Sequence, residues 1–340
     1  MRLFPGWIML LSASGVLGLL SFAAPPGSTT THGLLLIANK GDHTLGIIDP
    51  VAGREISTVP DEGITGHEVI ASPDGRTAYV PIYGNSGVGQ PGTDGEKLTI
   101  IDIGSRHVTG QLDFGKGVRP HCPKFGPKDG LLYVTTELSD SVTIIDPHTQ
   151  QIVGSVPTGQ RESHMLAITS DGRRGYTANV GVGTVSALDL EKRKLITVIP
   201  ICQVTQRISI SPDGRMAFTA DQKSPRLAVI DTAQNNVKTW IPLPAVAYGT
   251  ASTLDGRWLL VALPSAAKVA VVDLQTLQVA RTIDVMSAPQ EVLIRPDNRV
   301  AYVSCDRSRK VAAIDLQTWK VRKFITAGRG CDGMAWARAI

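Results

Sequence analysis

The sequence predicts an all-β protein: a seven-bladed β-propeller whose blades are four-stranded antiparallel sheets. Two observations predict this fold, namely a strand and turn pattern that recurs along the chain and partial copies of the same pattern at the two ends. The composition agrees with it. The 340 residues include 34 glycines and 21 prolines, and 42% are hydrophobic, which suits many short buried strands joined by tight turns.

The N-terminal residues differ from the rest of the chain. Arg2 supplies a positive charge, an uncharged apolar stretch runs from Trp7 to Phe22, and Ser21 and Ala23 place small residues at the two positions that a signal peptidase reads. This pattern predicts a secretory signal peptide at 1–23, followed by a linker at 24–32 and one propeller domain at 33–340. An uncleaved membrane anchor is the alternative, because the stretch is near the lower limit for spanning a bilayer. After processing we expect no stable membrane span, and a periplasmic or secreted protein.

Six full copies of one pattern follow. Each begins with an apolar strand, makes an Asp-Gly or Asp-Asn turn and continues into a second strand, as in HEVIASPDGRTAYV. A third strand then ends in aspartate, as in LTIIDI or VAVVDL, and a fourth follows, as in QIVGSVPT. The copies start 42 to 54 residues apart, at His67, His121, His164, Gln206, Tyr248 and Gln290.

The two ends of the chain supply the seventh blade. Residues 34–60 contain a second, third and fourth strand without a first, and the C-terminal CDGMAWARAI contains a first strand alone. A single four-stranded sheet cannot bury both of its faces, so the blades must stack. Joining the two ends in one blade closes the ring and removes the exposed edges of an open array.

Several of these segments carry a family resemblance. SPDGRTAYV, LYVTTE and AYVSCD, each followed by a strand of the VxVID type, resemble the YVTN repeat of exported bacterial propellers, YncE-like proteins included. The chain also resembles, more distantly, the lactonase-type seven-bladed propellers. The resemblance covers residues 33–340 and implies the fold. It does not imply one activity, because such propellers include enzymes, cofactor carriers and proteins without known activity.

Function is expected where the copies differ at one structural position. The entry to the innermost strand is such a position, and its residues should ring one mouth of the central channel: Asp332, His67, His121, His164, Gln206, Tyr248 and Gln290. Three consecutive blades present histidine here, next to an aspartate. This set predicts a site for one divalent transition metal ion held by His67, His121, His164 and Asp332.

The three histidines also have other interpretations. They are the predicted catalytic residues, because histidine can serve as general acid or base without a metal. A histidine before the innermost strand can instead be structural and tie its loop to the blade. A structural role should recur in all seven blades, whereas here histidine occurs in three neighbouring ones.

Further polar residues are predicted on the same face. The second strand of each blade returns to the channel mouth, and other polar residues lie beside the ring positions. Arginine there can bind a carboxylate or phosphate, or pair with a nearby glutamate such as Glu68 or Glu137. The predicted substrate-binding residues are Arg119, Arg161, Glu162, Asn39, Asn179, Asp221, Gln206, Tyr248 and Gln290. The insertion at 83–97 is expected on this face, as a binding loop or a solvated hairpin.

The four cysteines are too widely spaced for a CxxC motif. Cys305 ends a second strand and Cys331 opens the first strand of the adjacent blade, so these two are predicted to form a disulfide that locks the ring. Cys122 and Cys202 remain open: a second disulfide or buried thiols are expected, and Cys122 is an alternative ligand for the predicted metal.

Composition and missing motifs exclude several functions. The net charge of +4 is small and the charges are mixed, which argues against nucleic-acid binding. The sequence has no G-x-S-x-G, H-E-x-x-H, phosphate-loop or CxxCH motif. Two hypotheses remain for what we expect to be a monomer. One is a hydrolase, lyase or oxidase acting on a small polar substrate, and the other is a non-catalytic scaffold that binds a protein, glycan or wall component.

Overall fold

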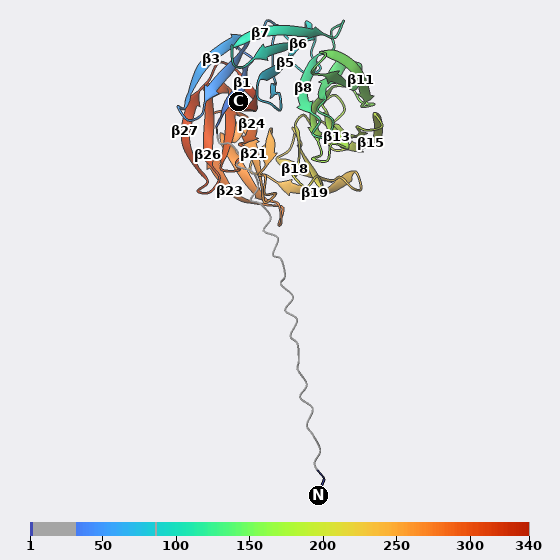
Figure 1. Ribbon diagram of the computed structural model, residues 1–340, viewed down its shortest axis with the longest axis vertical. Coiled ribbons are helices and arrows are strands. Elements are labelled where there is room, and N and C mark those ends of the chain that lie inside the picture. Colours follow the sequence, from blue (N-terminus) through green and yellow to red (C-terminus); the bar gives the residue numbers. More distant parts are fainter. Residues whose placement is uncertain (3–31, 86, 340) are drawn as a thin grey trace.

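The structure is a computed structural model that describes residues 1–2, 32–85 and 87–339. These residues form seven four-stranded sheets around a central channel, which confirms the predicted propeller (Figure 1). The predicted signal peptide and linker, 1–23 and 24–32, lie almost wholly outside the described residues. Among the described residues, no helix is long and apolar enough to cross a membrane.

The chain's two ends share blade 1, as predicted. The sheet of blade 1 contains β28 (Cys331–Arg338), β1 (Gly33–Asn39), β2 (Thr44–Asp49) and β3 (Arg54–Pro60). The C-terminal strand β28 is innermost and pairs antiparallel with β1, in a register that sets Leu35 opposite Trp336. This pairing closes the ring with ordinary backbone hydrogen bonds.

The remaining blades each use four consecutive strands, innermost first. Blade 2 contains β4 (Ile70–Ala71), β5 (Thr77–Gly84), β6 (Asp94–Asp102) and β7 (His107–Asp113). Blade 3 contains β8 (Pro120–Phe125), β9 (Leu132–Thr136), β10 (Ser141–Asp146) and β11 (Gln151–Pro157). Blade 4 contains β12 (Ser163–Ile168), β13 (Arg174–Asn179), β14 (Thr184–Asp189) and β15 (Lys194–Pro200).

Blades 5 to 7 repeat the arrangement. Blade 5 contains β16 (Ile208–Ile210), β17 (Met216–Ala220), β18 (Arg226–Asp231) and β19 (Asn236–Pro242). Blade 6 contains β20 (Thr250–Ser252), β21 (Trp258–Leu263), β22 (Lys268–Asp273) and β23 (Gln278–Asp284). Blade 7 contains β24 (Pro289–Ile294), β25 (Val300–Cys305), β26 (Lys310–Asp315) and β27 (Lys320–Thr326).

The repeated Asp-Gly turn has a physical reason. In blade 2 the Asp74 carboxylate accepts hydrogen bonds from the Arg76 backbone N–H, at 3.1 Å, and from the Ser72 hydroxyl. Gly75 between them has a φ of 79°, in the left-handed region that a side chain disfavours. The repeated aspartate and glycine therefore build the turn and are not candidates for function.

The aspartate that ends each third strand is structural as well. Asp49 accepts hydrogen bonds from the backbone N–H groups of Val51 and Ala52, at 2.8 and 3.0 Å, and so shapes the turn into the fourth strand. The same contact recurs in the other blades, at Asp102, Asp146, Asp189, Asp231, Asp273 and Asp315.

The hydrophobic core lies between the blades. One cluster joins blades 3, 4 and 5 through the buried side chains of Tyr133, Tyr176 and Ile230. Both faces of an interior blade are therefore covered, and each fully buried large side chain contributes roughly 1.5–3 kcal/mol to folding. The stacking that the repeats required is what stabilises the ring.

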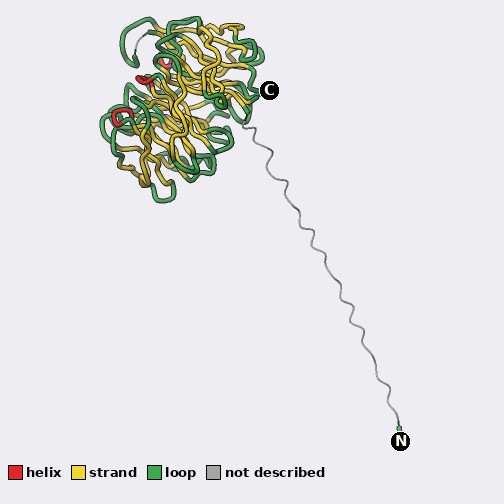
Figure 2. The backbone as a smooth tube through the Cα atoms, turned by 90° about the vertical axis from the view of Figure 1, so that its left-hand side faces the viewer, coloured by secondary structure: helices red, strands yellow, loops and turns green. Residues whose placement is uncertain are grey.

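Three short 3₁₀ helices connect second strands to third strands. They are η1 (Glu137–Ser139), η2 (Pro264–Ala266) and η3 (Asp306–Ser308). Figure 2 shows them gathered on one side of the molecule. This is the side at which the innermost strands begin, because each second strand runs antiparallel to the first.

The structure corrects the predicted disulfide. Cys305 and Cys331 are free, buried thiols, as is Cys122. The Cys305 thiol is directed to the Val303 carbonyl and the Cys331 thiol to the Lys310 carbonyl, both at 3.7 Å. A disulfide needs two Cβ atoms that point toward each other, and adjacent strand ends alone do not provide this. Cys202 is also free, and it is half-buried.

Candidate functional site

The seven predicted ring residues lie at one mouth of the channel. Four of them are the second residue of an innermost strand: His121 of β8, His164 of β12, Gln290 of β24 and Asp332 of β28. His67, Gln206 and Tyr248 come two or three residues before β4, β16 and β20. The mouth has two chemically different halves: a histidine half on blades 2 to 4, and a charged half whose residues lie at or beside the ring positions of blades 1, 2, 5 and 7.

The histidine half is a cluster of aromatic rings. The rings of His121 and His164 lie 3.7 Å apart between centroids, and His67 meets His121 edge to face at 5.5 Å. Tyr83, from the end of β5, stacks on His67 at 5.0 Å and contacts His121 at 5.2 Å. The structure therefore brings the three predicted histidines together and adds a tyrosine.

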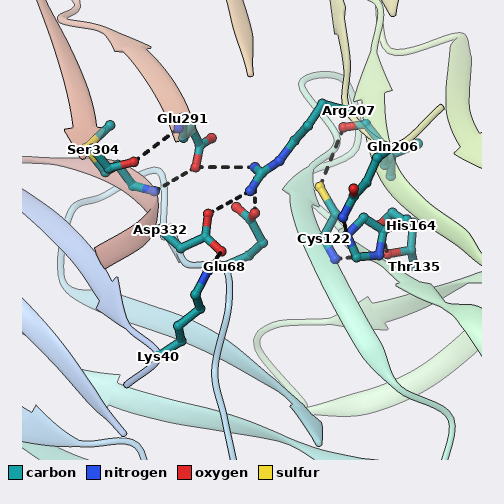
Figure 3. Close-up of polar contacts among 12 residues, drawn as sticks. Lys40, Glu68, Cys122, Thr135, His164, Gln206, Arg207, Glu291, Ser304 and Asp332 are labelled. Atoms are coloured by element: carbon teal, nitrogen blue, oxygen red, sulfur yellow. Dashed lines mark hydrogen bonds and ion pairs between the residues drawn. The ribbon is translucent and has the colours of Figure 1, made fainter. Parts of the chain in front are cut away.

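Backbone contacts hold the strands of this cluster side by side. The Thr135 hydroxyl of β9 accepts a hydrogen bond from the Cys122 backbone N–H at 2.9 Å. The same hydroxyl donates to the His164 carbonyl at 2.8 Å (Figure 3). One buried threonine thus ties the start of β8 to the start of β12, which places His121 beside His164.

Glu137 is the acidic member of the cluster. It is the first residue of η1 and is fully buried, and its two carboxylate oxygens have different partners. One accepts a hydrogen bond from the Tyr83 hydroxyl at 2.8 Å, and the other binds Nδ1 of His164. The carboxylate therefore links a tyrosine of blade 2 to a histidine of blade 4.

These hydrogen bonds determine the tautomer of His164. Glu137 accepts from Nδ1, so in the neutral ring the hydrogen is on Nδ1 and Nε2 carries a lone pair. Nε2 faces the side-chain amide of Gln206 at 3.2 Å, where the amide nitrogen donates (Figure 3). His164 thus presents a basic nitrogen toward the half-buried Gln206 at the mouth.

The other two histidines are held neutral. Burial lowers the pKa of His67 to about 4, although Asp332 opposes this shift. Burial, with His164 and His67 as positive neighbours when charged, lowers the pKa of His121 well below its ordinary value. His121 is 1% exposed, and its Nδ1 has no hydrogen-bond partner among the described residues. An unpaired buried nitrogen is costly, and a bound ligand can satisfy it.

Burial and Glu137 also act on Tyr83. They raise the pKa of its hydroxyl above the ordinary value, so this group remains a hydrogen-bond donor at neutral pH. Glu137 therefore has a hydrogen-bond partner on each side, Tyr83 on one and His164 on the other.

The charged half centres on Arg207, which is buried at the start of blade 5 (Figure 3). Its guanidinium lies 2.7 Å from Glu68, 2.7 Å from Asp332 and 3.7 Å from Glu291, three carboxylates from three other blades. Tyr248 covers the guanidinium, with 4.9 Å from Cζ to the ring centroid. Arg207, Glu68, Asp332 and Glu291 together form the Arg207 network, which crosses the channel. Asp332 is engaged in this network by its ion pair with Arg207.

Lys40 extends the network toward solvent. Its ammonium lies 3.0 Å from Asp332 and 3.2 Å from Asp306. Burial opposes its charge, but these two carboxylates raise the pKa of Lys40. Burial raises the pKa of Glu68 and of Glu291 and the neighbouring carboxylates add to this shift, although Arg207 opposes it.

Comparison with known proteins agrees with the fold. A family model described as "Lactonase, 7-bladed beta-propeller" matches residues 50–239, more than half of the chain. The chain belongs to this family. Among solved structures, the Kuenenia stuttgartiensis hydrazine synthase is similar with a TM-score of 0.70 and 18% identity, over 83% of this chain and 92% of that chain. At this identity the likeness shows the fold alone. No curated protein sequence matches the chain.

The described residues do not arrange the four predicted ligands as a metal centre. Asp332 is bound to Lys40 and Arg207, and Nδ1 of His164 is bound to Glu137. The part of the chain that the structure describes contains no group of three or more His, Cys, Asp or Glu side chains placed to hold a metal ion. Cys122 is directed away, to the Leu166 carbonyl. The donor set fits acid-base chemistry instead.

Several predicted substrate-binding residues are structural. Asn179 is fully buried and binds Ser163, Thr184 and Ser186 within blade 4. Asn39 accepts a hydrogen bond from the Gly328 backbone N–H and donates to Glu55. Asp221 binds Arg226 and the Lys223 backbone N–H. The polar atoms of these three side chains are therefore engaged in hydrogen bonds that hold the fold.

Arg119 and Glu162 lie near the insertion at 83–97. Arg119 is buried and binds Asp94 at 2.6 Å and the Gln90 carbonyl at 2.7 Å, so it anchors the insertion and is not free for a substrate. Glu162 lies close to Gly89 of the same insertion. Arg161 is exposed. Gln206, Tyr248 and Gln290 are half-buried at the mouth, as predicted.

The main residues that sequence reasoning left out of the site are Glu137, Tyr83 and Lys40. Glu137 was placed at this face but assigned only as an ion-pair partner. One signal in the sequence could have identified Lys40 and Glu137. Each directly follows the second strand of its blade, as Asp306 also does, and the turn pattern does not explain a charge at this position. Tyr83 gives no such signal, because the insertion shifts its blade out of register.

Proposed function

We propose that this propeller is an exported hydrolase of small polar esters, with lactones as the first substrate class, and that Glu137 and His164 form its general-base pair. The observation that carries the proposal is the contact chain Tyr83 to Glu137 to His164. It fixes the imidazole with its lone pair on Nε2 and backs it with a buried carboxylate. Membership of the lactonase-type family and the YVTN-like repeat support the substrate class and export by analogy.

The proposed reaction starts with water bound at Nε2 of His164. Water attacks the ester carbonyl carbon while His164 takes one of its protons, and Glu137 stabilises the imidazolium that results. The tetrahedral intermediate then breaks its bond to the ring oxygen, and the imidazolium returns the proton to that leaving alkoxide. One water is consumed and one hydroxy acid is formed, without another reagent.

The mouth has groups that suit a polar substrate. Gln206 and Gln290 offer amides, and Tyr248 offers a ring face beside Arg207. In the structure the Gln206 amide occupies the position in front of His164 Nε2, at 3.2 Å. Substrate and water must displace it, so Gln206 is the residue that controls access to the base.

The test is proton release in a pH-stat with a panel of sugar and aliphatic lactones. We expect turnover by the mature chain and a loss of about 100-fold or more in kcat for His164→Gln and Glu137→Gln. His107→Gln is the matched control, since His107 is an exposed histidine on β7. Gln206→Ala should change KM more than kcat. Absence of turnover across the panel would overturn the proposal.

A non-catalytic binding scaffold is the second candidate. The burial of His121 and His164, 1% and 2% exposed, favours it, because a catalytic base must be reached by water. A scaffold would bind its partner at this mouth and leave every ester intact. In that case Gln206→Ala would change binding, and no variant would change a hydrolysis rate.

A further inference from the structure

A cavity lies further along the channel, beyond the mouth. It has a volume of about 400 Å³ and is lined by residues of all seven innermost strands. Arg207 and Glu291 belong to its wall, whereas the ring residues from Asp332 to Gln290 that mark the mouth do not. The Arg207 network therefore separates this lower cavity from the histidine cluster.

The wall of the lower cavity is mainly apolar. Its side chains include Ile70, Ile168, Ile210, Leu293, Ile294 and Trp336. Leu254 also lines it and is 51% exposed, so the cavity reaches solvent on the face that carries the Asp-Gly turns. A volume in this range with apolar walls and few polar groups is typical of a small-molecule site.

Lys124 is the charged side chain of this cavity wall that forms no ion pair with the residues that the structure describes. Arg207 and Glu291 are the other charged residues of the wall, and they face each other at 3.7 Å. The lysines that form ion pairs within the described residues are Lys40, Lys128, Lys192 and Lys268. Burial opposes the charge on Lys124, but Cys122, Glu291 and Glu68 together raise its pKa, so it is an ammonium at neutral pH.

Two more polar groups of the wall lack partners. The Ser252 hydroxyl and the Trp336 indole N–H are buried and make no hydrogen bond within the described residues. Both can donate, as can the ammonium of Lys124. These two atoms are shielded from the open space of the cavity, so the Lys124 ammonium is the donor that a ligand with acceptor oxygens would meet.

We propose that the lower cavity binds a small monocarboxylate with an aliphatic body. Its carboxylate pairs with Lys124 and its chain lies against the isoleucine and leucine side chains. One unpaired ammonium suits a single negative charge, whereas a phosphate dianion would need a second cation, and Arg207 is already bound by carboxylates. The inference is independent of hydrolysis at the mouth.

Calorimetric titration with octanoate tests the charge recognition. We expect Lys124→Met to weaken octanoate binding tenfold or more and Lys124→Arg to retain it, because an ion-paired hydrogen bond is lost in the first variant only. Lys128→Met, which removes an exposed lysine from the same hairpin, should bind like the wild type. Octan-1-ol should bind wild type and Lys124→Met alike. Equal octanoate binding by wild type and Lys124→Met, or no binding at millimolar octanoate, would overturn the proposal.

A second measurement locates the ligand without relying on Lys124. The bromine of 8-bromooctanoate quenches a tryptophan that it contacts, and Trp336 is the tryptophan of this wall. We expect quenching in the wild type that is lost in Trp336→Phe, while Trp240→Phe, on the outer strand β19, keeps it. Quenching that persists in Trp336→Phe would place the ligand elsewhere and contradict the assignment.

Discussion

The two halves of the channel mouth are built from opposite kinds of chemistry. The histidine half stacks His67, His121, His164 and Tyr83 with one carboxylate, and burial keeps at least two of its histidines neutral. The charged half gathers Arg207 and several carboxylates and holds them by mutual neutralisation. The same mouth of the channel thus holds a histidine cluster and a fixed ion-pair network, and the network forms where opposite charges lie within reach of each other.

This difference predicts which change should destabilise each half. A neutral cluster loses stability when acid charges it, whereas an ion-pair network loses stability when one member is removed. The experiments below separate these two behaviours, from the largest expected effect to the smallest.

Removing Arg207 should have the largest effect on stability. Arg207→Met leaves Glu68, Asp332 and Glu291 buried without their shared cation, so we expect a loss of about 3–5 kcal/mol in the free energy of unfolding. Urea denaturation measures it. Arg215→Met, at an exposed turn of the same blade, is the control and should change stability by less than about 0.5 kcal/mol. A loss no larger than that of the control would mean that the network does not hold the ring.

Lowering the pH should change the contributions of the two halves to the free energy of unfolding in opposite directions. The folded pKa of His67 is about 4, below its unfolded value of 6.5, so its contribution is present above pH 6.5 and is lost as the pH falls toward 4, by at most about 3 kcal/mol. His121 adds in the same direction. Glu68 and Glu291 have raised pKa values, so their protonation favours the folded state as the pH falls.

Difference curves separate these terms. The stability of the wild type minus that of His67→Gln should decrease from pH 7 to pH 4, and the corresponding difference for Glu68→Gln should increase over the acid range. Denaturation at a series of pH values measures both. Difference curves of the same sign would contradict the contrast between the halves.

Tyr83→Phe should have a smaller effect, within the histidine half alone. It removes the hydroxyl that donates to Glu137, and we expect a loss of about 1 kcal/mol in the free energy of unfolding. Tyr79→Phe is the matched control, because the Tyr79 hydroxyl makes no hydrogen bond in the described part of the chain. Equal losses in the two variants would show that the Tyr83 contact is not specific.

Metal content should show no difference between the wild type and its histidine variants. Elemental analysis of the untagged mature protein, after reloading with Zn, Cu, Ni and Fe, should find less than one metal ion per chain. The triple variant His67→Ala, His121→Ala, His164→Ala should give the same content. Stoichiometric metal that disappears in the triple variant would restore the metal site that the sequence predicts.

Sequence reasoning identified the fold and the ring but assigned the partners incompletely. The position of His121 and His164 at one mouth follows from where their strands begin, which the repeat reveals. Their contact with Glu137 depends on how η1 turns a side chain inward across two blades. Cys305 and Cys331 show the same limit, since neighbouring strand ends were predicted correctly and the bond between them was wrong.

The sequence by itself determined which residues build turns, which alternate into the blade interfaces and which start the innermost strands, because strand periodicity and turn chemistry act over a few residues. Only the tertiary structure decided that Arg207 meets Glu68, Asp332 and Glu291, and that Lys124 forms no ion pair with the described residues. The Arg207 contacts join side chains up to 139 residues apart across the channel. They depend on the radius of the ring and on the direction of each side chain, which no local pattern encodes.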